Sequence, residues 1–125
     1  MKIQLDGPGS DNVIQGYYPG RITINSINYT SSLILTPDRI IADWPPARFR
    51  DIQETHIEMI AALLPEVVVL GTGARLQFPA RAILKPLGLK RIGVEVMDTG
   101  AACRTYNVLV GEGRRVAAAL LMIEE

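Results

Sequence analysis

Cysteine and histidine are almost absent from this chain, which has one of each, Cys103 and His56, among 125 residues. A single cysteine cannot form an intrachain disulfide, so nothing in the sequence indicates an oxidising compartment. A nucleophilic thiol needs a base, but His56 falls on the apolar stripe of a predicted helix and Cys103 lies among alanines, where both are expected to serve packing. No metal-ligand spacing is visible either. We therefore predict no catalytic residues, no metal and no cofactor, which favours a protein without enzymatic activity.

An excess of one charge is also lacking, because thirteen basic and thirteen acidic side chains give a formal net charge of zero. This balance disfavours a general nucleic-acid coat protein and a polybasic membrane binder. Long apolar runs are missing too, since residues 116–123 fall far short of the roughly 20 residues needed to cross a bilayer. The first residues resemble neither a signal peptide nor a transit peptide. We expect a cytoplasmic protein that is not integral to a membrane.

The chain does have enough apolar sequence for one core, with 48% hydrophobic residues. A chain of this length is typical of one domain and buries about two-thirds of its unfolded surface. Residues 1–20 are rich in Gly, Pro, Asp and Asn, which predicts an extended arm with turns at Gly7–Gly9 and Pro19–Gly20. We therefore predict a single domain over residues 1–125, with an arm at 1–20 and a compact core at 21–122.

The first third of the core is rich in β-forming residues. Alternation over residues 21–27, a turn-like Asn25-Ser26 and a second run over 28–36 predict an antiparallel hairpin. A short strand follows at 40–42, and Trp44-Pro45-Pro46 then interrupts regular structure, because proline lacks a backbone donor. Trp44 is predicted either to cover one end of the sheet or to contact a partner.

Helical and strand patterns alternate after Asp51. A capping-box-like pair, Asp51 and Glu54, predicts a helix whose apolar face comprises Ile52, His56, Met59, Ile60 and Leu63. The elements expected next are a buried strand at 67–70, a helix at 79–84, a strand at 94–97, a helix at 100–109 and a strand at 116–122. The helix at 79–84 could continue past Pro86 to Leu87, and Gly88 ends it. We predict an α/β fold of three layers, with a mixed, partly parallel central sheet, an N-terminal β-hairpin layer and about three helices.

Two loops follow predicted strands, at the edge where ligands of open α/β sheets bind. Gly71-Thr72-Gly73 follows the strand at 67–70, and Asp98-Thr99 follows the strand at 94–97. Leu76 stands where a dinucleotide fingerprint needs glycine, and the ending of a phosphate-binding P-loop is absent, which argues against a nucleotide. The loops serve either as a tight chain reversal and a helix cap, or as a site for a small ligand or anion.

Charged side chains near these loops are candidates for contact with an anion or a partner. Arg75, Arg104 or Arg114 could bind an anion. Alternatively, Glu112 and Arg114 could pair with each other or with Arg104. Residues 67–94 contain no acid, and their five basic residues are Arg75, Arg81, Lys85, Lys90 and Arg91. Because Arg81 and Lys85 are four apart, they share a helix face. A basic face beside Gly71–Gly73 is where we expect a partner or an anion.

Several segments together resemble one family: residues 67–73 and 93–99, Ala102-Cys103, Thr105-Tyr106-Asn107 and Glu112-Gly113-Arg114. This is the domain of unknown function 498 family, which includes archaeal and bacterial proteins and a mitochondrial respiratory complex I assembly factor. The resemblance covers roughly residues 10–122. It implies a compact three-layer β/α fold without a securely assigned reaction, and partner proteins during complex I assembly in the animal members. Without a presequence, this chain looks like a free-standing bacterial member.

Three functions compete on these grounds, because a fold does not determine a function. The first is a non-enzymatic assembly or adaptor protein that binds a protein partner, linked by resemblance to respiratory complex assembly. The second is a small-ligand or anion-binding protein, or an uncharacterised enzyme, with its site between the two loops. The third, binding to nucleic acid or anionic lipid, would need a local basic patch. The candidate surface comprises Gly71, Thr72, Gly73, Arg75, Asp98, Thr99, Arg104, Thr105, Asn107, Glu112, Arg114 and Trp44.

Overall fold

The computed structural model describes residues 11–124, which form two β-sheets and three α-helices. The smaller sheet is antiparallel and has the order β1-β2-β3, and the larger has the order β5-β4-β8-β6-β7. The strands are β1 (Ile14–Tyr18), β2 (Arg21–Ile24), β3 (Ile27–Tyr29), β4 (Leu33–Thr36), β5 (Arg39–Ala42), β6 (Val67–Gly71), β7 (Gly93–Met97) and β8 (Val116–Leu120). The helices are α1 (Glu54–Ala61), α2 (Arg81–Leu89) and α3 (Thr99–Gly111), and a 3-10 turn, η2, spans Phe49–Asp51.

The larger sheet is mixed, which confirms the predicted fold class. Strand β6 pairs in parallel with β7 and with β8, whereas β4 pairs antiparallel with β5 and β8. The last strand in chain order, β8, therefore lies in the middle of the sheet, between β4 and β6. Because β6, β7 and β8 run in the same direction, the loops that follow them gather at one edge, which we call the carboxyl edge.

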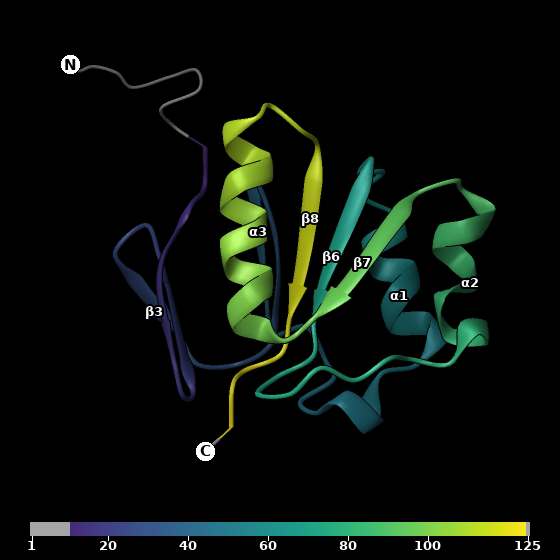
Figure 1. Ribbon diagram of the computed structural model, residues 1–125, viewed down its shortest axis with the longest axis horizontal. Coiled ribbons are helices and arrows are strands. Elements are labelled where there is room, and N and C mark those ends of the chain that lie inside the picture. Colours follow the sequence, from purple (N-terminus) through teal and green to yellow (C-terminus); the bar gives the residue numbers. More distant parts are fainter. Residues whose placement is uncertain (1–10, 125) are drawn as a thin grey trace.

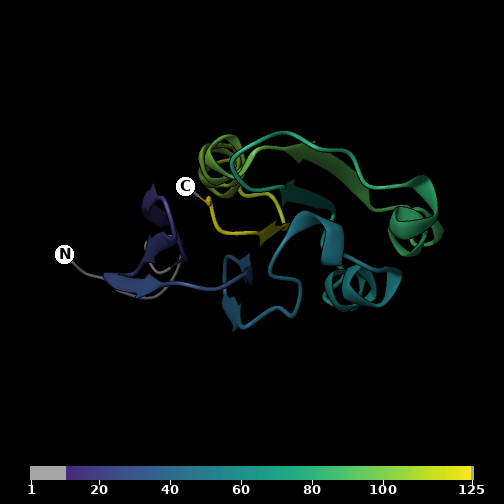
Figure 2. The ribbon, with the colours of Figure 1, turned by 90° about the horizontal axis from the view of Figure 1, so that it is seen from below.

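Helices cover both faces of the larger sheet, as Figures 1 and 2 show. Helix α3 and the smaller sheet pack on one face, and α1 and α2 pack on the other. The side chains of β6 alternate between these layers: Val67 and Val69 join the α3 side, and Val68 and Leu70 join the α1–α2 side. This two-sided burial explains why β6 is an unbroken apolar run.

The N-terminal β-region differs from its prediction at two points. Ile14–Tyr18 were expected in the extended arm, but they form β1 and pair with β2, while the turn expected at Gly7–Gly9 lies outside the described residues. The hairpin turns at Asn25-Ser26 as predicted, with φ values of 53° and 67°. The run over 28–36 is not one strand, because it leaves the smaller sheet after Tyr29 and enters the larger one at Leu33.

The first helix starts later than predicted. Asp51 belongs to η2, where its carboxylate accepts from the backbone N–H of Arg48 at 3.2 Å, and α1 begins at Glu54 after the N-cap residue Gln53. Ile52 is therefore buried but lies outside the helix. The predicted apolar face is wrong, because it included Ile52 and omitted Ile57. The residues of α1 that are buried are Ile57, Ile60 and Ala61, while Met59 is 37% exposed.

The later elements agree with the prediction except at their ends. Helix α2 passes Pro86 and Gly88 and ends at Leu89, because Pro86 and Leu87 are buried against the core and this packing outweighs the missing backbone donor. Helix α3 begins at Thr99 and ends at Gly111, beyond the predicted bounds. Strand β8 ends at Leu120, two residues early.

Candidate functional site

The two predicted loops are hydrogen-bonded to each other at the carboxyl edge. The backbone N–H of Thr99 donates to the carbonyl of Gly73 at 2.9 Å, and the N–H of Thr72 donates to the carbonyl of Met97, also at 2.9 Å. A side chain at Gly71 would place its Cβ only 2.9 Å from Thr99 Oγ1, so glycine lets β6 approach α3 closely. Gly73 has a φ of 97°, a conformation that favours glycine.

The hydroxyl of Thr99 is fully buried and joins three segments. It accepts from the N–H of Gly73 at 2.8 Å and donates to the carbonyl of Leu121 at 2.7 Å. The predicted capping role therefore belongs to Asp98 alone, whose carboxylate accepts from the N–H of Ala101 at 2.9 Å. Thr99 cannot share that role because its only hydroxyl is turned toward the neighbouring loops.

The hydroxyl of Thr72 organises its own loop. It donates to the carbonyl of Arg75 at 2.6 Å and accepts from the N–H of Gln77 at 3.2 Å, and the residue is only 3% exposed. A threonine hydroxyl has one proton to donate, and here a backbone carbonyl receives it. Thr72 and Thr99, the two nominated threonines of these loops, thus hold the loops together with their hydroxyl groups.

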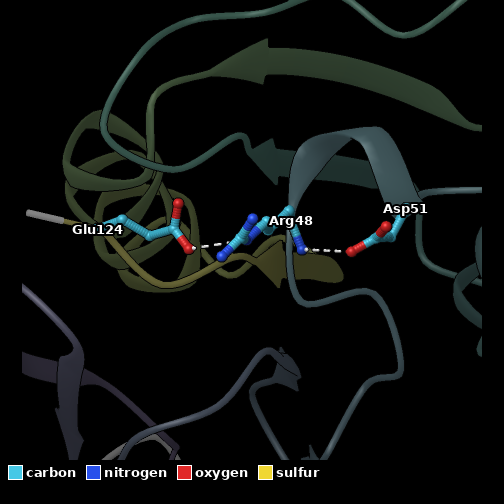
Figure 3. A network of polar contacts seen from close by, with 3 residues as sticks. All are labelled: Arg48, Asp51 and Glu124. Atoms are coloured by element: carbon cyan, nitrogen blue, oxygen red, sulfur yellow. Dashed lines mark hydrogen bonds and ion pairs between the residues drawn. The ribbon is translucent and has the colours of Figure 1, made fainter.

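A cavity of about 240 Å³ opens beside this loop, between residues 72–77, residues 47–50 and the segment after β8. Arg48, Arg50 and Arg75 line it. The Arg48 side chain pairs with Glu124 at 3.4 Å, as Figure 3 shows together with the contact between Arg48 and Asp51. Sequence reasoning missed Arg48 and Arg50, and the only available signal was the Arg-x-Arg spacing just before a predicted helix.

Three nominated residues on α3 face the smaller sheet or a neighbouring strand. Asn107 accepts from the N–H of Ile14 at 2.9 Å and donates to the carbonyl of the same residue at 2.8 Å. Arg104 donates to the hydroxyl of Tyr17 and lies over its ring, 5.9 Å from the centroid. Thr105 donates to the Met97 sulfur at 3.3 Å. The polar surface of α3 therefore anchors β1 and β7.

The two nominated residues after α3 lie at the opposite, amino edge of the parallel strands. Arg114 pairs with Glu66 at 3.1 Å rather than with Glu112 or Arg104, and Glu112 is exposed. The pKa of Glu66 is lowered, first by the backbone N–H of Arg115, which donates to it at 2.9 Å, and then by Arg114. The structure thus separates Glu112 and Arg114 from the two loops.

The largest of the cavities described here lies at this amino edge, with a volume of about 470 Å³. Its lining combines apolar and charged residues from the turn between β4 and β5, from the segment after α1 and from the turn after α3. Leu64, in that segment, is 61% exposed. The charged residues that line the cavity are Asp11, Asp38, Arg39, Arg114 and Arg115.

Trp44, His56 and Cys103 serve packing in this structure. Trp44 is 2% exposed and donates from Nε1 to the carbonyl of His56 at 3.2 Å, so it packs in the core. The Nδ1 of His56 accepts from the N–H of Gln53 at 3.0 Å, at the start of α1. Burial raises the pKa of the Cys103 thiol to about 12, against the opposing effect of Arg104.

Residues 11–124 lack both a metal-binding cluster and a membrane-spanning helix. No group of three or more His, Cys, Asp or Glu residues in this part of the chain could hold a metal ion. No helix in it is long and apolar enough to cross a membrane.

Comparison with known proteins places the chain in a family. Residues 14–121 match the model of a protein family of unknown function, DUF498/DUF598. The chain is 37% identical over 123 residues to the zebrafish (Danio rerio) NADH dehydrogenase (ubiquinone) 1 alpha subcomplex assembly factor 3, covering 97% of this chain and 70% of that protein. It is 29% identical over 122 residues to the 13 kDa major membrane protein of Francisella tularensis subsp. holarctica, covering 97% of this chain and 99% of the relative.

A solved structure agrees with these matches. The crystal structure of a protein from Bordetella parapertussis superposes with a TM-score of 0.86 at 38% identity, covering 90% of this chain and 97% of that one. The match of residues 14–121 spans both sheets and all three helices, including the loops at the carboxyl edge. The chain therefore belongs to the DUF498/DUF598 family.

Proposed function

We propose that this protein is a non-enzymatic assembly factor that binds a protein partner while a respiratory complex is built. The observation that carries the proposal is the 37% identity to the zebrafish assembly factor over 97% of this chain. The hydroxyls of Thr72 and Thr99 donate to backbone carbonyls and Cys103 is buried in α3, which supports a role in which none of these three side chains reacts with a substrate. In this proposal the protein meets its partner in the cytoplasm.

We place the partner contact at the cavity of the amino edge. Protein interfaces combine an apolar centre with a polar rim. The apolar lining here includes Leu64, Pro65 and Val110, and Arg39 and Arg115 contribute exposed charge. Leu64 is the residue to change first, because 61% of it is exposed and little of its surface contributes to the core.

Deletion of the gene, followed by native gel electrophoresis of the respiratory complexes, tests the proposal. We expect less fully assembled NADH dehydrogenase and an accumulation of partial complexes, both restored by the wild-type gene. Leu64→Asp should fail to restore assembly while folding normally, because aspartate tolerates the positive φ of 55° at this position. Val108→Asp, on the exposed surface of α3, is the matched control. Normal assembly in the deletion strain would exclude the proposed role.

A second candidate function, binding of a small anion, rests on the cavity at the carboxyl edge. Arg50 and Arg75 line it, and within the described residues neither has a carboxylate within 4.0 Å. Titration calorimetry with inorganic phosphate should show binding that Arg75→Gln weakens at least about tenfold, the loss expected for a hydrogen bond between charged groups. Arg115→Gln should leave binding unchanged. The absence of heat with the wild-type protein would remove this candidate.

A further inference from the structure

The most exposed large apolar side chains among the described residues lie in α2 or in the segment just before it. Leu89 is 73% exposed and Phe78 is 71% exposed. Leu76, in the same part of the chain, is 50% exposed. Phe78 lies in the segment that leads into α2, and Leu89 is the last residue of that helix. In Figure 1, α2 forms the outer end of the molecule, beyond β7. Two large apolar side chains this exposed are available for contact with another molecule.

Basic side chains lie between these apolar ones. Arg81, Lys85 and Leu89 recur every four residues along α2, so they occupy one helix face, and all three are exposed. Pro86 and Leu87, on the opposite face, are buried in the core. The outer face of α2 therefore presents two cations between Phe78 at one end and Leu89 at the other.

The cations of this region have no fixed partners. Within residues 11–124, the recorded ion pairs join Arg48 to Glu124 and Arg114 to Glu66, and neither involves residues 75–91. Residues 67–94 include no acid, and the neighbouring helix α1 carries Glu54 and Glu58, which are exposed and make no ion pair with α2. The uncompensated cations are Arg75, Arg81, Lys85, Lys90 and Arg91.

We propose that this basic edge, residues 75–91, docks on an anionic lipid bilayer surface. In this arrangement Phe78 and Leu89 enter the headgroup region, and Arg81 and Lys85, on the outer face of α2, face lipid phosphates. The inference goes beyond the proposed function and does not depend on it. The formal net charge is zero for the whole chain, but residues 75–91 carry five basic residues and no acid.

The arrangement fits a bilayer better than it fits an acidic protein. Phe78 lies three residues before the first residue of α2 and Leu89 is its last, and the two ends of the helix are about 12 Å apart at 1.5 Å per residue. They project separately from the surface and line neither of the two cavities at the edges of the sheet. A protein partner usually meets one contiguous apolar centre, whereas a lipid surface can accept separated apolar side chains with cations between them.

Co-sedimentation with vesicles tests the proposal with the intact chain. Vesicles of phosphatidylglycerol and phosphatidylcholine in equal amounts should bind the protein at low salt, and vesicles of phosphatidylcholine alone should not. Binding should weaken as salt is added, because exposed charges are screened. The double variant Arg81→Glu with Lys85→Glu should bind at least about 25-fold more weakly, since each cation removed costs about fivefold and each new carboxylate is also repelled by the anionic lipid. Phe78→Ser with Leu89→Ser should weaken binding at least tenfold, on the order of the transfer of two apolar side chains.

Two matched controls and a competing probe complete the test. Arg39→Glu and Val108→Ser change an exposed cation and an exposed apolar residue elsewhere, and binding should be unchanged. All four substituted residues of the basic edge are exposed, so circular dichroism should show folded variants. Absence of wild-type binding, or equal binding by the edge variants, overturns the proposal. So does binding to a polyglutamate peptide that is stronger than binding to the anionic vesicles, since that would assign the edge to an acidic protein.

Discussion

The turn at Gly71–Gly73 and the basic edge at residues 75–91 are consecutive in the chain but differ in how their polar groups are paired. In the turn, the hydroxyls of Thr72 and the neighbouring Thr99 both donate to backbone carbonyls. On the basic edge, five cations have no recorded carboxylate partner among the described residues. Polar groups that are buried must be paired inside the protein, whereas exposed groups are free to bind other molecules. The turn therefore contributes to folding, and the edge is available for binding.

Thr99→Val should give the largest loss of stability among the substitutions that remove hydrogen bonds. Valine has nearly the same shape but leaves the N–H of Gly73 and the carbonyl of Leu121 without a partner inside the protein. We expect a loss of about 3 kcal/mol in the free energy of unfolding, measured by urea denaturation. Thr105→Val, on the same helix, removes only a bond to sulfur and should cost less than about 1 kcal/mol. Equal losses would show that Thr99 does not have the proposed structural role.

Asn107→Ala should have the next largest effect, because its side chain holds both backbone groups of Ile14. We expect a loss of about 2 kcal/mol. Hydrogen exchange should accelerate in β1 more than in β6, since the change detaches an edge strand of the smaller sheet. Val108→Ala, at the adjacent exposed position, is the control. Uniform acceleration across both sheets would contradict a local role for Asn107.

Leu89→Ser and Phe78→Ser should each change the free energy of unfolding by less than about 0.5 kcal/mol, as is usual for exposed positions. Leu87→Ala is the control on the same helix: it is 1% exposed, and the change should cost about 3 kcal/mol. If Leu89→Ser is as destabilising as Leu87→Ala, the basic edge belongs to the core and our distinction between the two regions fails.

Glu66→Gln should give the smallest change in stability, and this change should depend on pH. The pKa of Glu66 is lowered in the folded protein, so its ionised form stabilises the fold above the ordinary glutamate value, and this stabilisation is lost as the pH falls through the lowered pKa. The variant should therefore be less stable than wild type near neutral pH, and the difference should vanish in acid. Arg114→Gln should reproduce only part of it, because the N–H of Arg115 is the larger cause. A difference that is independent of pH would contradict this assignment.

Local patterns predicted much of the fold. The β-branched run at 67–70 identified a strand buried on both faces, and alternation of helices and strands after Asp51 indicated a mixed, partly parallel sheet. The pattern could not show that Ile14–Tyr18 pair with β2, because that strand is held by Asn107, which is 93 residues away in the sequence. It also misplaced the start of α1, since the cap at Gln53 depends on the orientation of the His56 ring.

The candidate site was predictable in position but not in role. Thr72 and Thr99 were expected at one edge because both follow strands of a parallel pair. The direction of each hydroxyl depends on carbonyl groups of Arg75 and Leu121, which no spacing in the sequence reveals. The arginines at 48 and 50 were missed for a similar reason, because the fold brings η2 beside the loop after β6.

The central position of β8 has a consequence for how the chain is made. Leu33 in β4 pairs with Leu120 in β8, and Val67 in β6 pairs with Val116. During translation, β4 and β6 therefore leave the ribosome with an unpaired edge each and stay so until β8 has been synthesised. At about 5–20 residues per second, β4 waits several seconds. Nascent chains halted before residue 116 should accordingly remain sensitive to protease and should bind chaperones, while chains extended past β8 should become resistant in a single step.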